Sequence, residues 1–420
     1  MRFLHTSDWH LGRTLEGRSR QAEQEAFLEE LCRLAEDEKI DVVLVAGDVF
    51  DAFNPPAAAE QLFYDALDSL AAGGKRAVVV IAGNHDSPER LVAASPLARR
   101  QGIVLLGVPG DGPSIMPAPD CGCARVLAGG ASWLELTVPG CGHTAVLLAL
   151  PYPSETRLKE LLHGSLEDEP AVQQAYSSKV RQLFGKLAEN CRRDTVNLAL
   201  SHIFVQGGRT SDSERPVFSM GGASAVLPED LPQAVQYVAL GHLHRPQALR
   251  GGGVDCRYSG SPLAYSFSES GQAKSVVVVD VSPGRPAEVC EIPLSSGCPL
   301  VRWHAAGGLD QVYRWLEEGR DPRAWIDLEI KLDAPLSLQE VQQLRRACGR
   351  FIDIRADYPG FRLESERQSR AGLPVDQLFA VFYERRYGVK PDKQMISLFM
   401  DILGGGEEDL PESGSGGEVA

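Results

Sequence analysis

The sequence predicts an α/β fold followed by a small α+β domain, and three observations support this. Through the first hundred residues, apolar runs typical of buried strands alternate with amphipathic helical stretches. Between residues 103 and 150 the helical period disappears, and short apolar runs are separated by Gly and Pro. After a break in composition at residues 282–286, a pattern of strand, helix, strand, helix and strand begins. We therefore expect a first domain over residues 1–281 and a small α+β capping domain over residues 287–360.

The first domain is expected to contain parallel strands covered by helices, because strand and helix patterns alternate in its first part. The helical spacing of Phe27, Leu28 and Leu31 predicts a helix over residues 21–39. Residues 103–150 are expected to add antiparallel strands, and the Gly-, Ser- and Pro-rich residues 204–231 to form a loop beside the functional site. The remaining elements are expected as strands at 3–6, 41–46, 77–82, 196–201, 236–240 and 275–281, and as helices at 57–70 and 171–190.

The C-terminal residues have a different pattern. Residues 374–403 contain two short helix patterns, separated by Gly388 and Pro391. Phe379 lies on the apolar face of the first helix pattern and Phe399 on that of the second. Two apolar-faced helices after a polar linker favour docking onto a partner over packing on the chain's own core. Residues 404–420, rich in Gly, Ser and Glu, are predicted to be a disordered acidic tail.

The composition is that of a globular protein, with 43% hydrophobic and 24% charged residues. No apolar run approaches the roughly 20 residues of a membrane-spanning helix, and the N-terminus lacks a signal-peptide core, so we expect a cytoplasmic protein with no membrane part. The nine cysteines include no C-x-x-C pair, which indicates neither a zinc ribbon nor a disulfide framework. The net charge of −15 argues against nucleic-acid binding through the overall field, although part of that charge lies in the tail.

Side chains able to bind metal ions follow five of the predicted strands. Open α/β sheets place ligand sites at such strand ends, so we expect these residues to form one site. In an extended chain Asp8 and His10, and likewise His242 and His244, would lie on the same side. Carboxylate, amide and imidazole donors without thiolate suit two Mn, Fe or Zn ions bridged by one carboxylate, as in hydrolytic two-metal centres. The candidate ligands are Asp8, His10, Asp48, Asn84, His202, His242 and His244.

These motifs, in their order along the chain, resemble those of the calcineurin-like metallophosphoesterase superfamily. They are D-x-H at residues 8–10, G-D at 47–48, G-N-H-D at 83–86, a single His202 and G-H-x-H at 241–244. More narrowly, residues 6–12, the turn at 258–262 and the appended C-terminal parts resemble the SbcD family of nuclease subunits. The resemblance implies a β-sandwich flanked by helices.

The same resemblance implies roles for the site residues. His85 would be the general acid near the leaving oxygen, oriented by Asp86, and manganese would be the working ion. One ion would be held by Asp8, His10, Asp48 and His244, and a second by Asp48, Asn84, His202 and His242, so that Asp48 is the bridge.

The resemblance also implies partners and a substrate. An SMC-type ATPase, SbcC, would bind residues 374–403 and gate the access of DNA by its nucleotide state. Two copies of the chain would pair through helices near residues 57–70 and 88–100, giving a heterotetramer with the partner. The expected reaction is metal-dependent hydrolysis of DNA, as a 3′–5′ exonuclease on double strands and an endonuclease on single strands and hairpins, in end processing, repair and recombination.

Two other functions are compatible with the same motifs: a stand-alone metallophosphoesterase acting on a small phosphodiester or a phosphoprotein, and an inactive scaffold. Several residues also keep two interpretations. Asp51 either supports a ligand or only forms a turn, and residues 258–262 either approach the substrate or close the sheet. By strand parity His5 faces away from the ligands and is expected in the core. Basic side chains in a loop are usually only solvated, but Arg13, Arg18 and Arg20 are candidate phosphate contacts.

Overall fold

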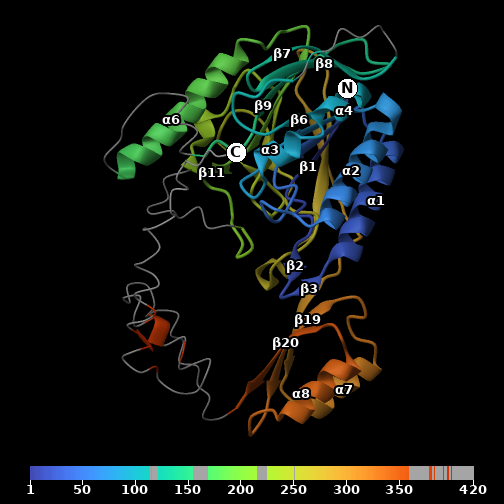
Figure 1. Cartoon of the computed structure of the whole chain (residues 1–420), viewed down its shortest axis with the longest axis vertical. Helices are drawn as coiled ribbons and strands as arrows, with labels where there is room; N and C mark the ends of the chain where they lie inside the picture. The colour runs from blue at the N-terminus through green and yellow to red at the C-terminus, as the bar shows by residue number, and fades with distance from the viewer. Residues whose placement is uncertain are drawn as a thin grey trace, which may run out of the picture. The chain divides into compact units, whose positions relative to one another are not determined.

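The computed structural model describes residues 1–113, 115, 122–154, 169–214, 225–249 and 251–358, together with 378–380, 383, 391, 395–396 and 399. Within these residues two β-sheets pack against each other through a shared apolar core, and helices cover their outer faces (Figure 1). The prediction of an α/β fold built on a helix-flanked β-sandwich is therefore confirmed.

The first sheet consists of β1 (Arg2–Thr6), β4 (Val42–Ala46), β5 (Ala77–Ile81), β6 (Ile103–Leu106), β16 (Ser275–Asp280) and β17 (Glu288–Pro293). Its strand order is β17-β16-β1-β4-β5-β6. The strands from β1 to β6 in this order run parallel, and β16 and β17 continue the sheet in antiparallel pairing. The carboxyl ends of β1, β4 and β5 therefore lie next to one another at one edge of the sheet.

The second sheet consists of β7 (Arg125–Gly130), β8 (Trp133–Thr137), β9 (Ala145–Leu150), β10 (Val196–His202), β13 (Tyr237–Gly241), β14 (Gln247–Leu249) and β15 (Cys256–Tyr258). Its strand order is β14-β15-β13-β10-β9-β8-β7. The strands β9, β10, β13 and β15 run parallel, whereas β7, β8 and β14 pair antiparallel with their neighbours. Here too the carboxyl ends of two adjacent strands, β10 and β13, lie side by side.

One expectation for residues 103–150 is wrong. β7, β8 and β9 are antiparallel as predicted, but β6 pairs parallel with β5. The reason lies in the connection between β5 and β6, which contains α3 (Pro88–Val92), α4 (Ser95–Ala98) and η2 (Arg99–Gln101). A connection of this length can carry the chain back to the start of the sheet, so that the next strand runs in the same direction.

Three apolar clusters join the layers. Between the sheets, Phe3 and Leu44 of the first sheet pack with Leu147 and Leu198 of the second. The outer face of the first sheet is covered by α1 (Gln21–Asp37) and α2 (Ala57–Ala71), drawn in blue in Figure 1, and that of the second by α6 (Glu169–Ala188), drawn in green. Because both faces of the central strands are buried, β4 and β5 are apolar at every position.

Shorter elements complete this part of the chain. β2 (Thr14–Leu15) and β3 (Arg18–Ser19) form a small antiparallel pair, and β11 (Phe204–Val205) and β12 (Ala225–Val226) form a parallel one. The remaining 3₁₀ turns are η1 (Ala72–Gly74), η3 (Pro228–Asp230) and η4 (Phe267–Glu269). Residues 204–231, predicted to be a loop, therefore carry two short strands and a turn, and residues 215–224 lie outside the described part of the chain.

The second pattern folds in the predicted order, as β18 (Leu300–Ala305), α7 (Gly308–Glu317), β19 (Trp325–Lys331), α8 (Leu338–Ala347) and β20 (Phe351–Asp357). A capping box formed by Ser337 and Glu340 begins α8. Nε1 of Trp325 donates to Oε1 of Glu23 on α1 at 2.8 Å, and the N–H of Cys298 donates to Oε2 of the same residue at 2.7 Å. These bonds link the third sheet to α1.

The C-terminal predictions fall largely outside the described residues. Of residues 374–403, those described at 378–380, 383, 395–396 and 399 are helical, and the rings of Phe379 and Phe399 stack at 4.0 Å. The predicted tail at 404–420 lies wholly outside. Among the described residues, no helix combines the length and the apolar character needed to span a membrane.

Candidate metal centre

The candidate ligands lie at the adjacent strand ends of the two sheets. Asp8, Asp48 and Asn84 follow β1, β4 and β5 of the first sheet, whereas His202 ends β10 and His242 follows β13 of the second. β10 and β13 both contact β4, so the two sets of strand ends face each other. Each of the seven predicted ligands lies within contact distance of at least one other.

Asp48 lies at the centre of this cluster. Its Oδ2 is 3.5 Å from Nε2 of His202 and 3.7 Å from Nε2 of His10. These imidazoles belong to different sheets, so a single oxygen reaches both halves of the cluster. The other oxygen, Oδ1, accepts a hydrogen bond of 2.8 Å from the backbone N–H of His85. A carboxylate that bridges two cations needs this kind of central position.

Asp8, His10 and His244 form the first half of the cluster. Their ligand atoms lie within 4.8 Å of one another, and the Nε2 atoms of His10 and His244 are 3.0 Å apart. Oδ1 of Asp8 accepts from the N–H of His242 at 3.0 Å, and its Oδ2 accepts from the hydroxyl of Ser7 at 2.6 Å. All three residues are buried, so their charges are poorly screened by water.

Asn84, His202 and His242 form the second half. Oδ1 of Asn84 lies 2.9 Å from Nε2 of His202 and 3.0 Å from Nδ1 of His242. His202 also joins Asp8 and Asp48 in a group whose ligand atoms are within 4.8 Å of one another. This half is therefore contiguous with the first.

Hydrogen bonds on the outer side of the imidazoles decide which ring nitrogen faces the cluster. Nδ1 of His202 is 2.8 Å from the carbonyl oxygen of Ala46, so it carries a hydrogen and Nε2 is the atom directed at Asp48 and Asn84. Nδ1 of His244 is 2.6 Å from Oγ of Ser213. The hydroxyl of Ser213 donates to Oε1 of Glu269 at 2.6 Å, so it must accept from His244, whose Nε2 keeps a lone pair.

His10 has a carboxylate on its outer side, with Nδ1 3.3 Å from Oδ1 of Asp51. Donor atoms able to bind a metal ion face each other across the 3.0 Å between His10 and His244, and across the 2.9 Å between His202 and Asn84. Buried polar atoms that converge in this way are stabilised by a proton or a metal ion between them. The residues present thus fit a pair of divalent cations.

The backbone turns sharply at the ligands. Asp8, His10 and Asp48 have φ values of 54°, 45° and 50°, and His242 has a φ of 105°. The prediction that Asp8 and His10 share a side by strand alternation is therefore wrong, because left-handed turns bring them together. Such conformations cost about 1–3 kcal/mol each in residues other than glycine, and they concentrate at functional sites.

Two glycines allow the close approach of the strand ends. A Cβ atom on Gly241 would lie 1.8 Å from the carbonyl oxygen of Ala46, across the gap between the sheets. A Cβ atom on Gly83 would lie 2.1 Å from Oδ1 of Asp48. A side chain at Gly241 would push the two sheets apart, and one at Gly83 would displace Asp48.

His85 lies next to the cluster, with Nε2 4.0 Å from Oδ2 of Asp48. We expected Asp86 to orient it, but Nδ1 of His85 lies 2.8 Å from the backbone carbonyl of Asp51. The carboxylate of Asp86 instead accepts the backbone N–H groups of Gly83, Val49 and Phe50, at 2.8, 3.2 and 2.9 Å. Asp86 thus holds the loops after β4 and β5 together.

Burial and mutual charge shift the acidities of the ligands. Burial raises the pKa of Asp8 to about 7, since its charged form is desolvated. Burial also disfavours charge on Asp48, but the imidazole of His202 holds the pKa of Asp48 well below its usual range. Burial lowers the pKa of His242 to about 3 and that of His244 well below its usual value. These two imidazoles are therefore neutral and available as ligands.

The structure distinguishes between the two interpretations of Asp51 and of the turn at 258–262. Asp51 supports His10 and His85, as described above. Ser259 contacts the hydroxyl of Ser7 at 2.9 Å, and Tyr258 donates to the carbonyl of Ile203 at 2.8 Å, so the turn at 258–262 closes the sheet behind Asp8.

The remaining candidates outside the cluster are also placed. His5 is buried, with Nδ1 3.0 Å from the hydroxyl of Tyr237, which confirms its place in the core. Arg20 is buried in an ion pair with Glu23 and is not available to a phosphate. Arg13 donates to the backbone carbonyl of Ser213 at 3.0 Å.

The sequence analysis did not identify the residues that support His244. Its backbone N–H donates to Oε1 of Glu214 at 2.8 Å, and its carbonyl accepts from Nζ of Lys274 at 2.9 Å. Ser213 and Glu269 bond its ring, as described above. The prediction of a loop beside the site pointed to Ser213 and Glu214, but no spacing pattern connects Glu269 and Lys274 to a ligand.

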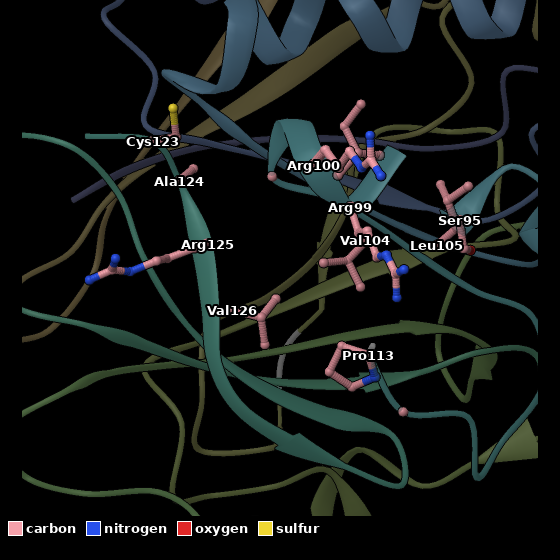
Figure 2. Close-up of a pocket in the computed structure, with 13 residues that line it drawn as sticks. Ser95, Arg99, Arg100, Val104, Leu105, Pro113, Cys123, Ala124, Arg125 and Val126 are labelled. Carbon is pink, nitrogen blue, oxygen red and sulfur yellow. The ribbon is translucent and has the colours of Figure 1, made fainter. Parts of the chain in front are cut away.

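A separate cavity of about 320 Å³ lies between β6 and β7, the edge strands of the two sheets (Figure 2). Arg99, Arg100 and Arg125 are among its lining residues. In Figure 2 their guanidinium groups point in different directions, so they do not meet at one anion. The cavity contains none of the candidate ligands.

Comparison with known proteins finds a family match in each of the two parts of the chain. Residues 1–246 match the family described as calcineurin-like phosphoesterase, and residues 297–387 match one described as the type 5 capsule protein repressor C-terminal domain. The SbcD subunit of the SbcCD nuclease of Bacillus subtilis is 48% identical over 410 residues, which cover 97% of this chain and 99% of the relative. The corresponding nuclease subunits of Rhodobacter capsulatus and Escherichia coli K12 are 38% and 31% identical, covering 73% and 90% of this chain and 72% and 92% of their own lengths.

Proposed function

This chain belongs to the SbcD family of the calcineurin-like phosphoesterases, and from this premise we propose that its buried cluster hydrolyses DNA phosphodiester bonds with two divalent cations. The observation that carries the proposal is the convergence of the seven candidate ligands in one cluster, in which Oδ2 of Asp48 lies 3.5 Å and 3.7 Å from imidazoles of the two sheets. A pair of adjacent cations favours phosphodiester hydrolysis because it can stabilise the charge that develops on both the attacking and the leaving oxygen.

The donor set divides between two cation positions. The first would be held by Asp8, His10, Asp48 and His244, and the second by Asp48, Asn84, His202 and His242. Bound there, the cations would polarise the phosphate and lower the pKa of a bound water from 15.7 towards about 7. Donors without thiolate are compatible with Mn²⁺, which we propose as the working ion.

His85 would hold and transfer the proton for the leaving oxygen. Its Nδ1–H is directed to the carbonyl of Asp51, so in the protonated ring the second hydrogen is on Nε2, which faces Asp48. Asp86 would act by holding the loops that carry Asp48 and His85.

The wider assembly follows from the family. We propose that an SbcC-like SMC-type ATPase binds residues 374–403, that two copies of this chain pair within a heterotetramer, and that the complex acts on DNA ends and hairpins in the cytoplasm. The relatives are named as one subunit of a nuclease, which supports a partner. The stacked rings of Phe379 and Phe399 support a helical docking unit. Because the chain carries a net charge of −15, the partner would supply much of the DNA-binding surface.

Reconstitution with the ATPase tests this function. The pair should cleave linear duplex and hairpin DNA with Mn²⁺, and a chelator should abolish the cleavage. Deleting residues 374–403 should abolish partner binding while Mn²⁺-dependent turnover of a small chromogenic phosphodiester survives. Turnover of that diester without any DNA cleavage by the pair would instead support a stand-alone phosphodiesterase.

A further inference from the structure

His244 belongs to a buried hydrogen-bond network of polar groups that extends away from the cation cluster. Its Nδ1 bonds Oγ of Ser213 at 2.6 Å, and Ser213 bonds Oε1 of Glu269 at 2.6 Å. Oε2 of Glu269 accepts from Nζ of Lys274, which also donates to Oγ of Ser261 at 3.0 Å and to the carbonyl of His244 at 2.9 Å. Both the ring and the backbone of His244 are therefore held by the same hydrogen-bond network.

The two charged side chains of this network are almost fully buried. Glu269 is 1% exposed and Lys274 is 8% exposed. Burying a carboxylate and an ammonium costs several kcal/mol per ion before pairing, and a hydrophobic pair of the same size would stabilise the fold at least as well. The pair is therefore poorly explained by stability alone, whereas two of its hydrogen bonds support His244: Lys274 donates to its carbonyl, and Glu269 accepts from the Ser213 hydroxyl that bonds its ring.

The direction of each hydrogen bond follows from the chemistry. Oε1 of Glu269 also accepts the backbone N–H of Tyr265 at 3.1 Å, so the carboxylate is bonded as an anion on both oxygens. An anion accepts, so the hydroxyl of Ser213 must donate to it. The same hydroxyl then accepts the Nδ1–H of His244, and the lone pair of Nε2 is left facing His10.

Two other imidazoles in the centre have backbone carbonyls on their outer side. Nδ1 of His202 meets the carbonyl of Ala46, and Nδ1 of His85 meets the carbonyl of Asp51. The outer-shell partner of a ligating imidazole fixes its orientation and tunes its basicity. Changes at Ser213 or Glu269 should therefore act on His244 and leave His202 unchanged.

We propose that Ser213 and Glu269 are positioning residues for His244, and that they set the affinity of the first cation position without affecting the second. The inference rests on the two-cation function proposed above. Ser213 and Glu269 touch neither cation nor substrate, so they act through the orientation and basicity of one imidazole.

The test is a calorimetric titration of the metal-free, full-length chain with Mn²⁺. Ser213→Ala should weaken one of the two binding events by about 10–100-fold, the range known for outer-shell partners, and leave the other unchanged. Glu269→Gln should shift the same event in the same direction by a smaller factor. Ser213→Thr, which keeps the hydroxyl, should restore it. DNA cleavage by Ser213→Ala should recover as the Mn²⁺ concentration is raised.

A matched control exists elsewhere in the chain. Ser177 on α6 is buried, donates to Oδ2 of Asp230 at 2.6 Å and accepts the N–H of Leu227 at 2.8 Å, so it is also a hydroxyl joined to an acid. Ser177→Ala should leave both Mn²⁺ affinities unchanged. Unchanged affinities in Ser213→Ala, or equal losses in both serine variants, would overturn the inference. A wild-type chain that binds no Mn²⁺ would overturn the two-cation function itself, a different and distinguishable result.

Discussion

The two sheets contribute different chemistry to the centre. The first supplies every oxygen donor, Asp8, Asp48 and Asn84, whereas the second supplies only imidazoles. The anionic charge therefore comes from one sheet, and the neutral donors that surround it come mainly from the other. Neither sheet holds a complete set for even one cation, so the site exists only while the sheets are packed together.

The strained backbone conformations of the ligands are also divided between the two sheets. The left-handed residues Asp8, His10 and Asp48 all lie in the first sheet's loops, and His242 is the left-handed ligand of the second. Backbone N–H groups hold the carboxylates of Asp8 and Asp48, whereas side chains hold His244. Both kinds of support come from residues distant in sequence.

Removing the shared carboxylate should give the largest effect. Asp48→Ala should abolish binding of both cations, because Oδ2 lies between imidazoles of both sheets and is the proposed ligand of both cations. We expect DNA cleavage to fall by at least about 10³-fold, since loss of a single preorganised electrostatic group costs 10²–10³. Metal analysis of the purified variant checks the binding. Retention of two ions would show that neither cation position depends on Asp48.

His85→Ala should separate proton transfer from metal binding. The expected fall in kcat is about 10²–10⁴-fold, the usual contribution of a general acid. Both Mn²⁺ affinities should stay near those of the wild type, because neither proposed ligand set includes His85. Calorimetry and single-turnover cleavage measure the two quantities, and unchanged cleavage would exclude His85 as the proton donor.

The packing between the two sheets can be disrupted without changing a candidate metal ligand. In Gly241→Ala the new Cβ would lie 1.8 Å from the carbonyl of Ala46, so the sheets must separate locally. We expect a loss of about 3 kcal/mol in the free energy of unfolding in urea, together with weaker Mn²⁺ binding. As a control, Gly185→Ala in α6, where nothing lies within 4 Å of the new Cβ, should raise stability by up to about 1 kcal/mol.

The smallest effect is expected away from both halves, at Glu23. Burial opposes its ionisation, but hydrogen bonds and charge from Arg20, with the indole N–H of Trp325, lower its pKa below the usual value. A carboxyl with a lowered folded-state pKa stabilises the fold above its unfolded pKa of about 4.3, and this contribution is lost as the pH falls through the lowered value.

Thermal unfolding of Glu23→Gln over a range of pH tests this sign. The variant should melt below the wild type at pH 7, and the difference should shrink as the pH falls below about 4. Glu25→Gln, an exposed position on the same helix, should melt with the wild type throughout. A difference that grows in acid would contradict the assignment.

The strand ends were predictable because their signals are local. A buried apolar strand followed at once by Asp48, or by Asn84 and His85, can be recognised from a few neighbouring residues. The direction of β6 was not predictable, because it depends on how the connection before it folds and not on the strand's own residues. The role of Asp86 was missed for the same reason: its partners are backbone N–H groups, which any sequence provides.

The sequence alone determined the α/β class, the order of the elements and the seven candidate ligands, because periodicity and strand-end motifs are written in consecutive residues. Only the tertiary structure decided which ligand atoms face each other, and that Ser213, Glu269 and Lys274 support His244 from outside the cluster. The physical reason is that hydrogen-bond direction and burial are properties of atoms brought together from distant parts of the chain, and no local pattern records them.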